Sequence, residues 1–298
     1  MEDLWIPITI AAAFFQNLRF MLQKTLTGRL STLGVTFSRF LFAAPLAWVV
    51  VAGLLARDGA AWPGLTPAFA GFAAVGAVAQ ILATALLVFL FSLRNFAVGV
   101  TLSKTETVTT ALLSAAILAE PVGPGAWAAI AVTVAGLAAL SGPSVPGAML
   151  GGLVSRAAAI GVAAGAIFAV ASVGYRGASL ALAGGDVWVR AAVTLAAVTT
   201  FQTVLMAAWL AWREPGQIGA VCAAWRVAVW VGVTGMLGSL GWFTAFTLQN
   251  AALVKALGQI EVVFTLAASV LVFRERLTRA EVLGIALIVG GIFLILRL

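Results

Sequence analysis

The sequence lacks histidine altogether, has a single cysteine, and contains few charged residues, which make up 9% of its 298 positions. Without histidine the chain has no Ser–His–Asp triad and lacks the commonest metal ligand and proton shuttle. The lone Cys222 excludes an intramolecular disulfide and a cysteine-based metal cluster. A P-loop of the form GxxxxGK[ST] is also missing. We therefore expect no cofactor, no metal site and no enzymatic activity.

The scarcity of charge also excludes a soluble fold, because soluble domains carry about 25% charged residues. Hydrophobic residues account for 63% of the chain, and they gather in ten apolar segments. These segments span approximately residues 4–23, 32–55, 67–92, 97–118, 123–141, 156–176, 187–212, 226–248, 252–273 and 280–297. Since about 20 apolar residues cross a bilayer as a helix, we predict an all-α membrane protein with ten transmembrane helices. The net charge of +7 does not indicate nucleic-acid binding, because the basic residues lie singly between apolar runs.

An internal repeat appears when the sequence is compared with itself at an offset of 155 residues. Glu106 then matches Glu261, and Glu120 matches Glu275. Further upstream the offset changes to 151, where Arg39 matches Arg190. The clearest loop, residues 142–147, lies at the midpoint, so we predict two five-helix units, 1–145 and 146–298. An odd number of helices per unit makes the repeats inverted, as in many secondary transporters that enclose a central cavity.

Orientation is predicted from lysine and arginine near the helix ends. The odd-numbered loops hold nine such residues: Lys24, Arg29, Arg94, Arg156, Arg213, Arg226, Arg274, Arg276 and Arg279. The opposite side holds four: Arg57, Arg176, Lys255 and Arg297. This count predicts that both termini lie outside. Residues 1–3 contain no lysine or arginine, so we expect the first segment to be retained as a helix.

Ionisable side chains within the apolar segments are candidate functional residues, since each costs several kcal/mol in the bilayer without a partner or a wet cavity. The repeat predicts one pair between Arg39 and Glu106 and a second between Arg190 and Glu261. One interpretation is that both pairs brace their halves as structural ion pairs. The other is that the charges line the transport path and exchange partners during gating.

Polar side chains at mid-segment indicate which helices face a cavity. We expect the segments at 4–23, 67–92, 97–118, 156–176, 226–248 and 252–273 to line it. The candidate substrate-binding residues are Gln16, Gln80, Lys104, Trp242 and Gln259. Lys104 has Gln259 as its repeat counterpart, so it holds a substrate carboxylate, extends to the interface, or shares Glu106. Trp242 lies well inside its segment, which favours a pocket wall over the interfacial aromatic belt.

The pattern resembles the EamA-type drug/metabolite transporter superfamily. The residues that carry the resemblance are 118–122 (Leu-Ala-Glu-Pro-Val) through Gly136, and 273–277 (Phe-Arg-Glu-Arg-Leu) through Gly284, Gly290 and Gly291. Within the superfamily the chain is most similar to the bacterial aromatic amino acid exporters of the YddG type. The resemblance implies a multi-pass exporter of the bacterial inner membrane that works by alternating access. It also implies that Glu120 and Glu275 belong to helix ends and not to the substrate site.

Three functions follow from these observations. The first is export of amino acids, above all aromatic and large neutral ones, with the solute and the lipid bilayer as the only partners; the sequence does not specify an oligomeric state. The second is export of drugs or quaternary cations, which favours an unpaired carboxylate among aromatic rings. The third is a membrane-embedded enzyme or scaffold without flux, for which no motif is present.

The asymmetry at Lys104 makes a testable prediction. Replacing it with alanine lowers transport without loss of folded protein, because the variant removes a ligand for the solute and no helix-forming residue. The measurement is flux of a labelled solute in reconstituted vesicles. A well-folded Lys104→Ala variant with wild-type flux would refute the role.

Overall fold

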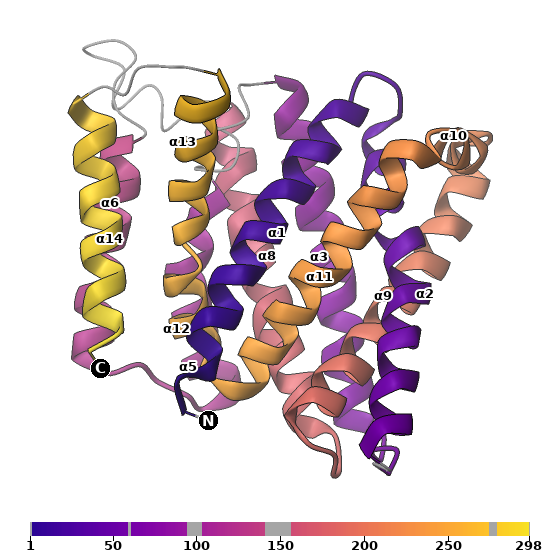
Figure 1. Ribbon diagram of the computed structural model, residues 1–298, viewed down its shortest axis with the longest axis horizontal. Coiled ribbons are helices and arrows are strands. Elements are labelled where there is room, and N and C mark those ends of the chain that lie inside the picture. The colour runs from indigo at the N-terminus through magenta and orange to yellow at the C-terminus, as the bar shows by residue number, and fades with distance from the viewer. Residues whose placement is uncertain (1, 59–60, 94–102, 141–155, 274–278, 298) are drawn as a thin grey trace.

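A computed structural model of the chain describes residues 2–58, 61–93, 103–140, 156–273 and 279–297. Apart from an isolated bridge between Gly64 and Ala183, the regular structure in these ranges is helical. Figure 1 shows the helices packed side by side in one bundle, with both ends of the chain at the same end of the bundle. The all-α prediction is therefore confirmed.

Every predicted apolar segment coincides with helical structure. The first half contains η1 (Glu2–Leu4), α1 (Trp5–Leu26), α2 (Thr32–Asp58), α3 (Pro67–Leu93), η2 (Ser103–Thr105), α5 (Glu106–Leu118) and α6 (Pro124–Leu140). The second half contains α8 (Arg156–Ala181), α9 (Val187–Arg213), α10 (Gln217–Ala223), α11 (Trp225–Leu248), α12 (Ala251–Leu257), α13 (Ile260–Phe273) and α14 (Arg279–Ile295). The predicted boundary at 145/146 lies outside the described residues.

Six of the described helices are long and apolar enough to cross a membrane, namely α1, α2, α3, α8, α9 and α11. The other predicted spans are shorter for two reasons. The ninth segment is divided into α12 and α13, the described part of the fourth consists of the turn η2 and the 13 residues of α5, and α6 and α14 have 17 residues each, or roughly 25 Å of helix. The expectation of one continuous helix is therefore wrong for the ninth segment.

Irregular turns lie at equivalent positions of the two halves, 155 residues apart. In the first half, the 3-10 turn η2 at 103–105 precedes α5. In the second half, Gly258 and Gln259 separate α12 from α13. A glycine at position 258 is explained by packing, because a Cβ there would lie 2.5 Å from the indole ring of Trp242.

The turns place the two buried glutamates at comparable depths. Glu106 begins α5 and Glu261 is the second residue of α13, and each is followed by twelve further helical residues, ending at Leu118 and Phe273. At 1.5 Å per residue, each carboxylate lies roughly 18 Å along its helix from that end. Both glutamates therefore lie well inside the bundle.

Helix packing also repeats between the halves. Gly136 of α6 packs against the backbone at Gly284 of α14, and Gly291 of α14 packs against the backbone at Ala129 of α6. Gly136 and Gly291 are 155 residues apart, and so are Ala129 and Gly284, so the two contacts are equivalent under the repeat. The helix pairs α1–α11 and α3–α8 correspond in the same way, as do α5–α8 and α1–α13. An exchange of this kind is the pattern that a two-fold axis produces at an interface.

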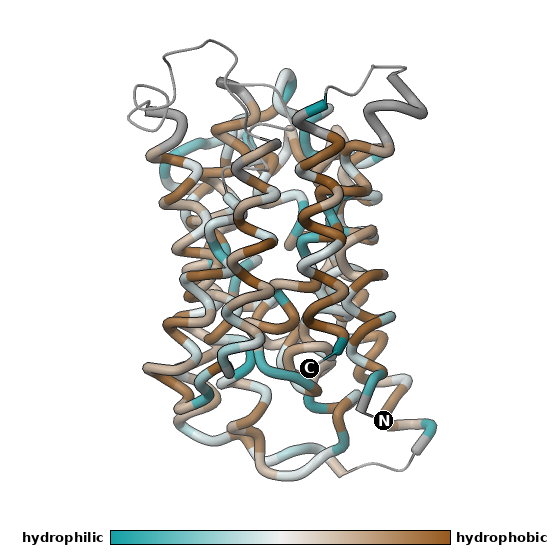
Figure 2. The backbone as a smooth tube through the Cα atoms, turned by 90° about the vertical axis from the view of Figure 1, so that its left-hand side faces the viewer, coloured by the Kyte–Doolittle hydropathy of each residue, from teal (hydrophilic) through white to brown (hydrophobic). Residues whose placement is uncertain are grey.

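The outside of the bundle is apolar. Figure 2 shows hydrophobic residues along the length of the helices and hydrophilic ones towards the two ends of the bundle. Large side chains such as Val49, Val204 and Phe293 are exposed on this surface. An exposed apolar surface of this extent is typical of contact with lipid, so the fold is that of a multi-pass membrane protein.

The α6–α14 contact offers a matched pair of substitutions at adjacent glycines. A Cβ at Gly291 would meet the Ala129 carbonyl and Thr133, whereas a Cβ at Gly290 meets nothing within 4 Å. We expect Gly291→Ala to destabilise the protein by about 1–3 kcal/mol through overpacking, and Gly290→Ala to stabilise it by roughly 0.5–1 kcal/mol. Thermal unfolding in detergent measures both. Equal stability of the two variants would contradict the close contact.

Candidate functional site

A cavity lies among six helical elements, α1, α3, α5, α8, α11 and α12, joined by the turn η2. They correspond to the six segments that the sequence predicted to line a cavity. About 490 Å³ within it is not occupied by atoms, part of this space being open to solvent. The polar side chains in its wall include Gln16, Gln80, Glu106, Tyr175 and Lys255. Trp242 and three phenylalanines from α1 and α11 contribute an aromatic wall.

An ion pair lies in the wall of the cavity. The Lys255 ammonium is 3.4 Å from Oε2 and 3.5 Å from Oε1 of Glu106, and both side chains are more than nine-tenths buried. The same ammonium lies 4.5 Å from the centroid of the Trp242 ring and 5.7 Å from that of Phe246. Buried cations are stabilised by a carboxylate and by the faces of aromatic rings. Lys255 is therefore fixed between a carboxylate and the aromatic wall.

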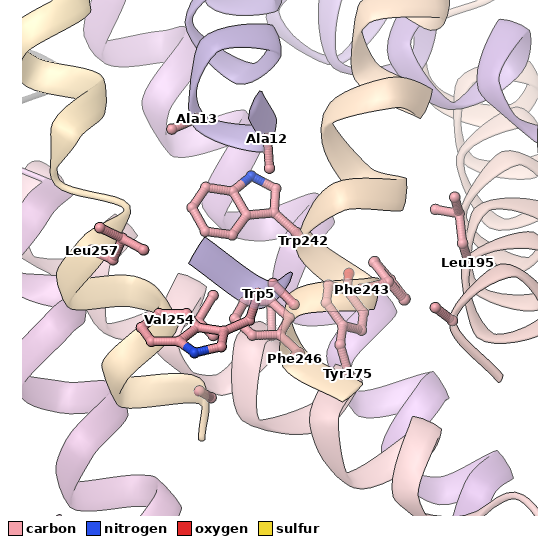
Figure 3. Close-up of a cluster of buried hydrophobic side chains, with 14 of the residues drawn as sticks. Trp5, Ala12, Ala13, Tyr175, Leu195, Trp242, Phe243, Phe246, Val254 and Leu257 are labelled. Atoms are coloured by element: carbon pink, nitrogen blue, oxygen red, sulfur yellow. The ribbon is translucent and has the colours of Figure 1, made fainter. Parts of the chain in front are cut away.

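Trp242 connects this ion pair to the second buried glutamate. Its indole N–H donates to Oε1 of Gln16 at 3.0 Å, and the amide of Gln16 donates to Oε2 of Glu261 at 2.8 Å. Figure 3 shows the Trp242 ring between the backbone of α1 near Ala12 and α12 near Leu257. A buried tryptophan needs an acceptor for its N–H, and Gln16 supplies one while orienting its own amide towards the carboxylate.

A neutral polar cluster forms another part of the wall. The Tyr175 hydroxyl donates to Oε1 of Gln80 at 2.7 Å, and the Gln202 amide donates to the same oxygen at 3.0 Å. The Tyr175 ring stacks on Phe243 at 4.3 Å between centroids, and the two rings lie side by side in Figure 3. This cluster holds Gln80 in one orientation at the cavity.

Three of the predicted binding residues, Gln16, Gln80 and Trp242, come together in this wall. Gln259 is buried and donates to the Thr107 hydroxyl, but it is not one of the lining residues. Lys104 lies in η2, and its side chain is outside the described residues. Whether these residues bind a solute remains a prediction.

Both predicted ion pairs are wrong. The Arg39 guanidinium donates to the hydroxyls of Thr84 and Ser239, while Glu106 pairs with Lys255. Arg190 donates to the Ser179 carbonyl, because it begins the second turn of α9 near the end of the bundle. The Glu261 carboxylate accepts from the Gln16 amide at 2.8 Å.

Lys255 and Tyr175 are among the lining residues that the sequence did not predict as binding residues. Lys255 was counted as a cation at a helix end, whereas its side chain is buried in the cavity wall. The offset of 151 that relates Arg39 to Arg190 also relates Lys104 to Lys255, and this signal would have identified it. Tyr175 is the single tyrosine of the chain, and nothing in its neighbourhood marked it.

A second, partly buried ion pair lies near the end of the bundle that holds the termini. Arg176 of α8 donates two hydrogen bonds of 2.6 Å to the Glu120 carboxylate, which follows the end of α5. The Nη1 group of Arg176 donates to the carbonyls of Phe246 and Gln249 at the end of α11, at 2.5 and 2.6 Å. We call this arrangement the Arg176 clasp. Glu120 thus lies at a helix end, as the resemblance implied, and joins residues of both halves.

Comparisons with known proteins bear on the family and the fold. Residues 155–297, just under half of the chain, match the EamA-like transporter family. No curated protein sequence matches the chain. Twenty-two chains of solved structures match this chain. One of them, described only as "Crystal structure of protein", has a TM-score of 0.69 and 18% identity, and the match covers 99% of this chain and 96% of that one. That likeness shows a shared fold over the whole length.

The Lys255–Glu106 pair yields a prediction for stability. Lys255→Met leaves the Glu106 carboxylate buried without this ammonium, and removing one partner of a buried pair costs about 3–5 kcal/mol. Adding Glu106→Gln removes the stranded charge, so the double variant recovers more than half of the loss. A double-mutant cycle by thermal unfolding in detergent measures the coupling. Additive effects of the two substitutions would contradict the pairing.

Proposed function

We propose that the protein is a transporter of the drug/metabolite superfamily that exports amino acids with aromatic or large neutral side chains. The match of residues 155–297 to the EamA-like transporter family supports the superfamily. The 155-residue offset carries the same features into the first half, including an irregular turn before a buried glutamate. The shared fold over the whole length is consistent with one transporter unit.

The proposed architecture is ten spans in two inverted five-helix repeats, 1–145 and 146–298. The exchange of contacts between α6 and α14 supports it, because each half presents the same positions to the other. The break between α12 and α13 supports it as well, since broken helices near mid-membrane are typical of transporter binding sites. In this proposal the halves rock against each other and expose the cavity to alternate sides of a bacterial inner membrane.

The observation that carries the substrate class is the buried ion pair beside an aromatic wall. Lys255 and Glu106 place one cation and one carboxylate at the same cavity. An amino acid zwitterion also has one charge of each sign, so it enters such a site without changing its net charge. Trp242, Phe243 and Phe246 offer a flat apolar surface to a large side chain.

Export of a quaternary cation is less consistent with this wall. A cation of that kind is normally held by the faces of aromatic rings and a nearby carboxylate. Here the Lys255 ammonium already lies on the faces of Trp242 and Phe246, and it pairs with Glu106. A second cation at the same rings meets a like charge at short range in a poorly screened environment.

Counterflow in liposomes tests this proposal. Labelled phenylalanine, leucine, glycine and a quaternary ammonium dye are offered to wild-type protein, and we expect saturable uptake of the first two. Trp242→Ala removes a wall of the site, so we expect phenylalanine flux to fall at least about tenfold. A tenfold loss corresponds to about 1.4 kcal/mol of lost interaction with the solute. Trp188→Ala is the matched control, since Trp188 is 41% exposed on α9 away from the cavity, and it keeps wild-type flux.

The other outcomes each identify an alternative. Uptake of the dye without that of amino acids favours the cation exporter. Absence of counterflow for every solute, in protein that remains folded, indicates a membrane protein without flux.

A further inference from the structure

Two arginines are buried side by side next to the cavity. Arg19 of α1 is 2% exposed and Arg39 of α2 is 4% exposed. Their aliphatic stems meet at Gly235 of α11, where a Cβ would lie 3.2 Å from Cδ of Arg19 and 3.1 Å from Cγ of Arg39. The position 155 residues earlier is Gln80. The first half thus has a glutamine side chain where the second half has Gly235. The stems of the two arginines occupy the space beside this glycine.

The bonding of the two guanidiniums is incomplete within the described residues. Arg39 donates to Thr84 at 3.5 Å and to Ser239 at 2.9 Å, two of its five N–H groups. Arg19 stacks on the Phe20 ring at 4.3 Å, and its Nη1 meets no acceptor. Hydroxyls and rings orient a guanidinium but do not neutralise it.

The charge around the pair is also unbalanced. Glu261 attracts Arg19 electrostatically, while Arg39 repels it. This one carboxylate also accepts from the Gln16 amide at 2.8 Å, and the described partners of Arg39 are the uncharged hydroxyls of Thr84 and Ser239. An uncompensated cation in a poorly polarisable interior costs several kcal/mol. The site therefore favours a bound anion.

Two residues that contact the arginine pair line the cavity. Phe20, which carries the Arg19 guanidinium on its face, lines the cavity. Ser239, which accepts from Arg39, lines it as well. Ser239 and Thr84 are themselves 155 residues apart, so Arg39 bridges equivalent positions of the two halves. An anion bound by the arginines thus lies at the wall of the cavity, between the halves.

We propose that Arg19 and Arg39 form a binding site for a small monovalent anion, and that the carboxylate of the transported solute occupies it. A guanidinium presents a planar fork of donors that matches a carboxylate, and two of them suit a group with two oxygens. The solute carboxylate rests on the proposed function; chloride offers the same charge without it. Lys255 stays bonded to Glu106, so the arginines and not the lysine receive the carboxylate.

The test measures binding in detergent, with phenylalanine as the carboxylate probe and phenethylamine as the same molecule without it. Arg19→Gln and Arg39→Gln each lower the affinity for phenylalanine at least tenfold and leave that for phenethylamine unchanged. Gly235→Ala keeps both charges but displaces the two guanidiniums, so it also lowers the affinity for phenylalanine. Arg213→Gln is the matched control, because that arginine is exposed and stacks on Trp212.

Chloride against gluconate at constant ionic strength distinguishes the two sources of the anion. If the solute carboxylate occupies the site, chloride competes with phenylalanine in wild-type protein and not with phenethylamine. If chloride is the resident anion, it raises the thermal stability of wild-type protein, and the arginine variants lose this gain while their affinity for phenylalanine is unchanged. Both results support the site, and the wild-type measurements hold even where a variant fails to fold.

Two results separate this inference from the proposed function. Wild-type counterflow of phenylalanine, with no chloride effect and with folded arginine variants that bind it normally, overturns the anion site alone. Absence of counterflow, together with chloride stabilisation that the variants lose, overturns amino acid export and leaves the anion site in place.

Discussion

The cost of holding ionised groups away from water governs the interior of this bundle. Lipid offers no hydrogen bonds and little screening, so every buried charge has to be met by another side chain, by a backbone group or by a bound solute. Glu106 is met by Lys255, and Arg176 by Glu120 and two carbonyls. Arg19 and Arg39 are the cations for which the described residues supply the least compensation.

The same constraint explains the irregular turns before the two buried glutamates. A continuous helix uses its own backbone groups fully, whereas an irregular turn leaves donors and acceptors that polar neighbours have to satisfy. Both turns lie beside a buried glutamate, and Gln259 and Thr107, one near each turn, hydrogen bond to each other. Polar side chains and irregular backbone thus occur together, at one level of the bundle.

The positions of the helices could be read from the sequence because each apolar run is about as long as the bilayer is thick. The repeat offset likewise anticipated equivalent features, such as Glu106 and Glu261. The six cavity-lining segments were also predicted, since glutamine at mid-segment, as at Gln16 and Gln80, has to face protein or water. Length, repeat position and polarity at mid-segment are properties of one helix alone, so they can be read from the sequence of that helix.

Partners could not be read in the same way, because pairing depends on how each helix is rotated and how deeply it lies. Arg39 was expected to meet Glu106, yet it lies between Thr84 and Ser239, two hydroxyls that carry no charge. Lys255 was assigned to a helix end, since nothing in the sequence showed that its segment breaks directly after Leu257. The break makes α12 a short helix of its own, whose direction the sequence does not give.

The Arg176 clasp has a consequence for how the molecule moves. One guanidinium joins the end of α5 to α8 and to the end of α11, through four short hydrogen bonds. Arg176 and the two carbonyls of α11 belong to the second half, so a movement that parts the halves on the side of the termini has to break both hydrogen bonds to Glu120. Because both bonds join one guanidinium to one carboxylate, they are lost together, and parting on this side is abrupt instead of gradual.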